Sequence, residues 1–239
     1  MARFVPRLFH SRRCESSRLN LHIDESGSQD LSEKKYLIGV VLHEHEADIL
    51  TPISTYEERL SQANLADVPF HDKDLLHGNK GYASVSTGDR KRLLTQFARL
   101  VRALPISFFS LKYSSTDTRG REELEAKIRR DLAALVFDHL RYFQSFDSIA
   151  VYYDGGQKVV STALHDALDY VLARNVADYR DADHLERRLL QVADYICTIE
   201  RVSDAYSAEQ QTKSHERFFG SRHSFMQSYM KQLERKRLK

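Results

Sequence analysis

The stretch RLNLHIDESGS, residues 18–28, decides how the rest of the chain is interpreted. Its alternating apolar residues predict a buried β-strand over Arg18–Ile23. That strand leads directly into two acids, Asp24 and Glu25, followed by Ser-Gly-Ser. Acids before Gly or Ser are common turn residues at strand ends. Alternatively, Asp24 is aimed into a site that requires a negative charge.

Outward from this strand, the hydrophobic patterning alternates between strand and helix. Four more strands are predicted at Tyr36–Leu42, Ile106–Tyr113, Ser148–Asp154 and Asn175–Tyr179. The 3.6-residue period predicts helices at about residues 51–62, 89–104, 124–143, 160–172, 185–196 and from 206 onward. An antiparallel beginning followed by βα units predicts one mixed sheet with helices on its faces.

The composition fits a globular protein with a well-buried core. The 239 residues are 41% hydrophobic and 29% charged, with only nine Gly and four Pro. A net charge of +2 permits a nucleic-acid partner without arguing for one. The two cysteines exclude a disulfide scaffold and favour a reducing compartment.

Residues 1–18 read as a loose basic tail, because they hold five arginines and a single acid but no apolar core for secretion. The longest apolar run, LIGVVL at residues 37–42, is too short to cross a bilayer. We therefore expect a cytoplasmic protein without a membrane partner.

Three acids on separate predicted elements suggest metal chemistry. Asp24 follows the first strand, Asp154 ends the fourth, and Asp194 lies on the helix at 185–196, away from its apolar stripe. Carboxylates brought close together repel one another unless protons or cations neutralise them. Oxygen ligands favour Mg²⁺ or Mn²⁺, and two such ions suit in-line attack on a phosphodiester. For each acid taken alone, a turn or a solvent-facing position is the competing interpretation.

Further candidates lie beside these acids. Glu25 points to the opposite face if the first strand continues, and reaches the same site only if the strand breaks at Ser26-Gly27. The segment FHDKDLLHGNKGY, residues 70–82, offers His71 and Asp74 three residues apart, on one side of a helix if it is helical. These two could bind a metal, position a phosphate or transfer a proton. A polar loop packed on the sheet end is equally compatible.

Serine-hydrolase and P-loop chemistry are not indicated. Ser26 stands in DESGS rather than in a GxSxG motif, and no Gly-Lys-Ser/Thr follows Gly155-Gly156.

Four motifs, HIDESGS, FHDKDLLHGNKGY, VYYDGG and LLQVADYI, occur in an order that resembles the bacterial family called domain of unknown function 3800. The resemblance runs from about residue 19 to about residue 201. It implies a ribonuclease H-like α/β fold with a five-stranded mixed sheet. In that superfold, acids on the first strand, at the end of the fourth strand and on the last core helix bind two Mg²⁺ ions. The resemblance carries these roles to Asp24, Asp154 and Asp194, and extends to Glu25, His71 and Asp74.

The expected organisation is a basic tail at residues 1–18, a ribonuclease H-like domain at 19–202 and a C-terminal helical extension at 203–239. Inserted helices and a loop occupy about residues 46–104 of the domain. The C-terminal helices are a candidate docking surface for a protein partner or a second copy of the chain.

The expected function is that of a divalent-metal-dependent nuclease or phosphodiesterase, with two Mg²⁺ or Mn²⁺ ions and either RNA or DNA as substrate. The alternative is a catalytically inactive ribonuclease H-like module that binds nucleic acid or protein, for example in a defence or mobile-element system.

Overall fold

The computed structural model describes residues 17–27, 35–115, 120–153, 158–172, 177–179 and 184–239. The strands are β1 (Arg18–Gly27), β2 (Lys35–Glu44), β3 (Ser107–Ser114), β4 (Ser148–Tyr153) and the three-residue β5 (Ala177–Tyr179). The helices before β4 are α1 (Leu50–Gln62), α2 (Asp72–His77), η1 (Lys80–Tyr82), α3 (Thr87–Ala103), α4 (Arg121–Asp138) and α5 (Leu140–Phe143). Those after it are α6 (Lys158–Leu172), α7 (His184–Ser207), α8 (Lys213–Phe219), α9 (Arg222–Phe225), η2 (Met226–Met230) and α10 (Lys231–Glu234).

An open mixed sheet forms the centre of the fold, as predicted. Its four longer strands lie in the order β3-β2-β1-β4, and the short β5 pairs in parallel with β4 at the edge. β2 is antiparallel to both β1 and β3. β1 is parallel to β4, with a register that ends at Ile23 opposite Tyr153.

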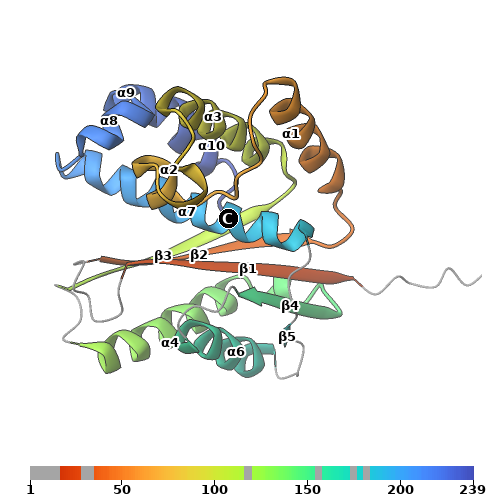
Figure 1. Ribbon diagram of the computed structural model, residues 1–239. Coiled ribbons are helices and arrows are strands. Elements are labelled where there is room, and N and C mark those ends of the chain that lie inside the picture. Colours follow the sequence, from red (N-terminus) through yellow and green to blue (C-terminus); the bar gives the residue numbers. More distant parts are fainter. Residues whose placement is uncertain (1–16, 28–34, 116–119, 154–157, 173–176, 180–183) are drawn as a thin grey trace, which may run out of the picture.

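Helices cover both faces of this sheet. Figure 1 shows α7 along one face, with α1–α3 and α8–α10 on the same side beyond α7, and α4 and α6 on the other face. The alternation of β1 explains this division. Its apolar residues Leu19, Leu21 and Ile23 are buried in the cluster that α4 and α6 complete. The residues between them therefore face α7.

A glycine of β2 allows α7 to lie unusually close to the sheet. A Cβ atom built on Gly39 would stand 2.9 Å from the Sγ atom of Cys197 and 3.1 Å from the carbonyl oxygen of Ala193. Both atoms belong to α7, so no larger residue fits at this position without a shift of the helix.

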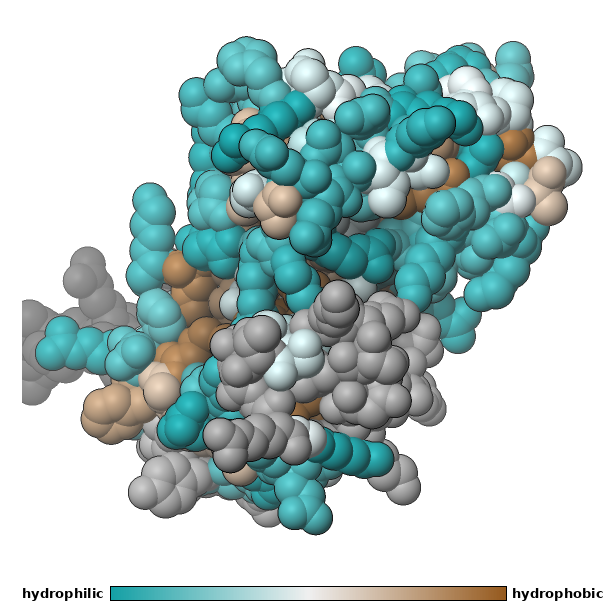
Figure 2. Space-filling view, turned by 90° about the vertical axis from the view of Figure 1, so that its left-hand side faces the viewer, coloured by the Kyte–Doolittle hydropathy of each residue, from teal (hydrophilic) through white to brown (hydrophobic). Residues whose placement is uncertain are grey.

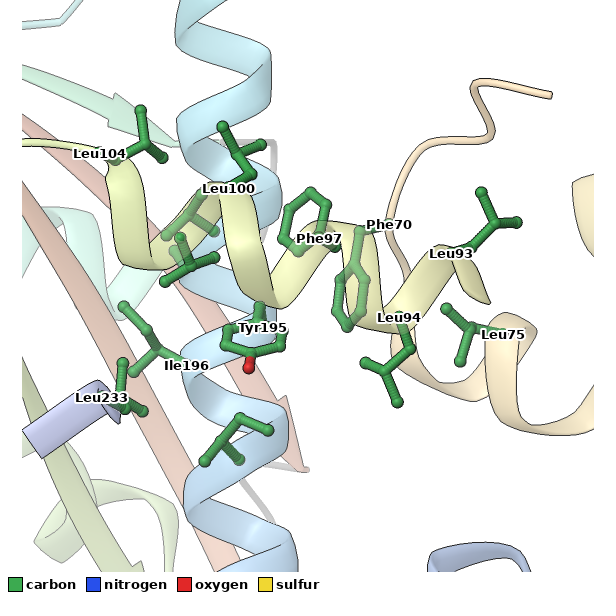
Figure 3. Close-up of a cluster of buried hydrophobic side chains, with 14 of the residues drawn as sticks. Phe70, Leu75, Leu93, Leu94, Phe97, Leu100, Leu104, Tyr195, Ile196 and Leu233 are labelled. Atoms are coloured by element: carbon green, nitrogen blue, oxygen red, sulfur yellow. The ribbon is translucent and has the colours of Figure 1, made fainter. Parts of the chain in front are cut away.

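The core on the α7 side is rich in aromatic rings, some of which are shown in Figure 3. The Phe70 ring, just before α2, stacks on Phe97 of α3 with centroids 4.7 Å apart. Tyr195 of α7 packs against both rings, at 5.6 Å from Phe70 and 5.7 Å from Phe97. These contacts hold the segment leading into α2 beside α7.

The C-terminal segment packs against the rest of the fold. The amide of Phe108 in β3 donates to the carbonyl oxygen of Lys236 at 3.0 Å. The amide of Leu238 donates to the carbonyl oxygen of Phe108 at 2.8 Å. The predicted boundary after residue 202 falls inside α7. Residues 213–234 are helical as expected, but in short consecutive pieces.

Two predicted elements have different ends in the structure. β1 does not stop at Ile23, because its pairing with β2 continues to Gly27 opposite Tyr36. The break at Ser26-Gly27 that would have let Glu25 reach the site of Asp24 is therefore not present, since both residues belong to β1. The helix predicted over 124–143 is interrupted at His139, which separates α4 from α5.

The face of the molecule shown in Figure 2 is mostly hydrophilic over the helical layer, and hydrophobic residues gather in a small area at one side near the level of the sheet. Among the helices that the structure describes, none is both long and apolar enough to cross a membrane.

Candidate active site

A polar row on β1 faces α7 and leads to Asp24. Asn20 and His22 are fully buried. The Nδ2 atom of Asn20 donates to the Oε1 atom of Glu186 at 3.4 Å, and the His22 ring pairs with the other oxygen of the same carboxylate. Glu186 lies in the first turn of α7, where a negative charge is favourable. These contacts fix the beginning of α7 over β1.

Asp194 lies two turns further along α7, near the end of the polar row. The Thr198 hydroxyl donates to the backbone oxygen of Asp194 at 2.9 Å and lies 3.5 Å from its Oδ1 atom. The Sγ atom of Cys197 is 3.6 Å from the carbonyl oxygen of Asp24, which places the helix directly against this part of β1.

The electrostatics of Asp194 show that several carboxylates converge here. Its pKa is raised well above the usual range, first by burial, then by the negative charge of Asp24 and, more weakly, by that of Asp74. The Thr198 hydrogen bond and Lys73 oppose this shift only in part. Raised carboxyl pKa values caused by burial and like charges are characteristic of functional sites.

The third carboxylate, Asp74, comes from α2 and is partly neutralised. Its Oδ2 atom lies 3.1 Å from the Nδ1 atom of His71 and 3.3 Å from the Nζ atom of Lys80. Gly78 ends α2 with a φ of 74°, and this turn brings Lys80 back towards Asp74. Burial lowers the pKa of His71, while Asp74 opposes that effect.

The α2 segment is tied to α7 and to the end of β1. Asp72 is buried and forms an ion pair with Arg201 of α7, whose Nη1 atom donates to the Ser26 hydroxyl at 3.3 Å. On the other side, the amide of Phe70 donates to the Oε1 atom of Gln191 at 3.0 Å. The position of Asp74 therefore depends on two anchors to the same helix.

These elements enclose a pocket of about 450 Å³, which we call the acidic pocket. Carboxylates from β1, α2 and α7 share its lining with two cationic side chains and one imidazole. These residues are Asp24, Asp74, Asp194, Lys80, Arg187 and His71. Its size is that of ordinary ligand sites in proteins.

The acidic pocket brings together four of the six predicted site residues: Asp24, His71, Asp74 and Asp194. The segment around Asp74 is the helical alternative that the sequence left open. Glu25 is not among the four, because β1 continues and its side chain turns to the opposite face, where the Tyr36 hydroxyl donates to it. Asp154 lies outside the described residues, which reach Tyr153 in β4.

Further residues of the pocket were absent from the sequence prediction. Arg187, Leu190 and Gln191 precede Asp194 by seven, four and three positions, so one face of α7 carries all of them. This spacing was visible in the sequence as a second stripe beside the apolar one. Lys80 had no such signal, because the turn at Gly78 brings it there.

The donor chemistry of the pocket fits a hard divalent cation, since its three carboxylates offer oxygen ligands only. Within the described part of the chain, no group of three or more His, Cys, Asp or Glu side chains is arranged to hold a metal ion.

Protein-family models, curated proteins and solved structures all give no match to this chain. The function of the acidic pocket is therefore inferred from its own carboxylates and the charged side chains around them.

Proposed function

We propose that the protein is a divalent-metal-dependent nuclease or phosphodiesterase with a ribonuclease H-like fold, related to the family called domain of unknown function 3800. One observation carries the proposal. Asp24, Asp74 and Asp194 come from three separate elements and line one pocket, where burial and like charge raise the pKa of Asp194. Like-charged carboxylates held in a partly buried site are unfavourable unless a proton or a cation neutralises them, and a divalent cation would do so for Asp24 and Asp194.

The order of elements supports the fold assignment. A ribonuclease H-like site takes one acid from the first strand, one from the end of the fourth and one from the last core helix. Here β1 carries Asp24 and α7 carries Asp194. The described part of β4 ends at Tyr153, which Asp154 follows directly in sequence.

Asp24 and Asp194 would hold the ions, together with Asp154. When bound, two Mg²⁺ or Mn²⁺ ions would activate the attacking water and stabilise the leaving oxygen of a phosphodiester. The chain itself supplies the surrounding charges. The Lys80 side chain is 77% exposed, so it can leave Asp74 to contact a phosphate. Arg187 is exposed at the same pocket and offers a second phosphate contact.

The proposal is tested by metal binding and cleavage together. Calorimetric titration with Mn²⁺ should detect binding to the wild type and not to Asp24→Asn or Asp194→Asn. The same variants should lose Mg²⁺- or Mn²⁺-dependent cleavage of single- and double-stranded RNA and DNA substrates. Asp166→Asn is the matched control, because Asp166 is an exposed acid on α6, in the opposite layer.

The ion pairs of Asp74 favour a second candidate, a non-catalytic module that binds nucleic acid or protein. In the structure Lys80 already offsets the charge of this carboxylate, and the His71 ring lies within hydrogen-bond distance of it. An absence of Mn²⁺ binding in the wild type, combined with retained nucleic-acid binding, would support the module and refute the nuclease.

A further inference from the structure

A second pocket, of about 320 Å³, lies between α3 and the C-terminal helices η2 and α10, with Tyr195 of α7 in its lining. We call it the basic pocket, because Arg99, Arg102 and Lys236 line it and no acidic residue does. Val101 and Leu233 add apolar surface. A volume of this size suits one small molecule rather than a polymer.

The three cations of the basic pocket lack a counter-charge. Within the described residues none of them forms an ion pair. The Arg99 Nη1 atom lies 3.5 Å from the amide oxygen of Gln96, and the Lys236 Nζ atom donates to the carbonyl oxygen of Leu104 at 2.6 Å. Burial lowers the pKa of Lys236. Like charges around one cavity with low-dielectric walls attract an anion.

Tyr195 contributes a hydroxyl group to the lining of the same pocket. The residue is only 3% exposed, and its ring packs on Phe70 and Phe97. Figure 3 shows its oxygen on the side of the ring away from Phe97. No hydrogen bond of this hydroxyl is found among the described residues, although buried tyrosines usually have one.

The neighbours of the Tyr195 hydroxyl belong to the same pocket. Burial raises its pKa, Tyr229 raises it further, and Arg102 opposes the shift. Both neighbours line the basic pocket. A phenol is protonated at neutral pH, so this hydroxyl is available to donate a hydrogen bond to a ligand in that pocket.

We propose that the basic pocket binds a small organic anion, whose phosphate or carboxylate group contacts Arg99, Arg102 and the Tyr195 hydroxyl. Its apolar part lies against Val101 and Leu233. Guanidinium groups match planar or tetrahedral oxyanions through paired hydrogen bonds, which explains the preference for an anionic head group. The inference is independent of the metal chemistry proposed for the acidic pocket.

Calorimetric titration of the full chain, stripped of metal with EDTA and then dialysed into EDTA-free Tris buffer, with phenyl phosphate and benzoate as probes, tests the proposal. At least one of them should bind, and whichever binds identifies the head group. Phenol, which lacks the anionic group, should not bind. Arg102→Ala and Tyr195→Phe should each weaken binding about 10-fold or more, because each removes a hydrogen bond to a charged group. Lys91→Ala is the matched control, since it removes an exposed cation from the same helix.

Thermal melting without ligand establishes that each variant folds, and Arg102→Gln replaces Arg102→Ala if that variant does not. Tyr195→Phe keeps the ring contacts, so its effect on binding reports the hydroxyl. The proposal is overturned if neither probe binds at about 1 mM, a very weak affinity. It is also overturned if Arg102→Ala and Lys91→Ala weaken binding equally, or if inorganic phosphate binds as tightly as phenyl phosphate.

Discussion

Replacing Asp194 by Asn tests whether the acidic pocket is electrostatically strained. Burial and the charges of Asp24 and Asp74 raise the pKa of Asp194. The native state therefore keeps this proton to a higher pH than the unfolded chain does. Between the two pKa values the unfolded state binds fewer protons, so the free energy of unfolding falls as the pH rises. Asn never ionises, yet it still offers an acceptor to the Thr198 hydroxyl.

The size of this effect follows from the linkage relation. Each unit by which the native pKa exceeds the unfolded one costs about 1.4 kcal/mol once the pH is above both values. Asp194 is only partly exposed, so solvent screens little of this cost. We expect Asp194→Asn to raise the free energy of unfolding at neutral pH by about 1–2 kcal/mol, as is typical when a destabilised functional site is relieved. The gain should vanish near pH 3, where both pKa values lie above the pH.

Urea unfolding followed by circular dichroism, at a series of pH values in EDTA, measures the difference. Added Mn²⁺ should then stabilise the wild type and leave Asp194→Asn unchanged, because a ligand stabilises only the state that binds it. Asp166→Asn should show no pH-dependent gain. The reasoning is refuted if Asp194→Asn is no more stable than the wild type at neutral pH in EDTA, or if the difference does not change with pH.

Three other substitutions test separate parts of the structure. Asp24→Asn should abolish metal-dependent cleavage, while Glu25→Gln should keep most of it, because the two side chains lie on opposite faces of the sheet. Equal losses of activity in a nuclease assay would contradict this assignment. Gly39→Ala should lower the free energy of unfolding by about 1–3 kcal/mol, because the added methyl group overpacks against Cys197. Adding Cys197→Ala should restore part of this loss in a double-mutant cycle. If the two effects are fully additive, residues 39 and 197 are not in contact. Glu200 is buried, which raises its pKa, but ion pairs with β3 and the C-terminal segment lower it overall. Glu200→Gln should therefore destabilise the protein by about 1–3 kcal/mol at neutral pH, and chemical denaturation should find a smaller loss below about pH 4.

Local patterns in the sequence predicted the elements and their types. Alternation in residues 18–23 indicated β1 and which face carries its apolar side chains, because side-chain direction in a strand follows from backbone geometry alone. The 3.6-residue stripes likewise indicated α3, α4 and α7. The ends were less predictable. β1 extends to Gly27 because β2 supplies backbone partners there, and that partner lies outside any local window.

For the acidic pocket too, some features follow from the sequence alone and others only from the tertiary structure. By itself, the sequence determined the mixed α/β class and a short set of candidate acids, since both follow from residue type and period. Only the tertiary structure decided that Asp194 faces Asp24 while Glu25 turns away. α7 packs closely on β2 at Gly39, which places Asp194 beside β1. The uninterrupted pairing of β1 with β2 keeps Asp24 and Glu25 on opposite faces of the sheet. The anchors from Arg201 and Gln191 bring Asp74 to the pocket, and the Gly78 turn brings Lys80 there, because only packing between distant segments sets such distances.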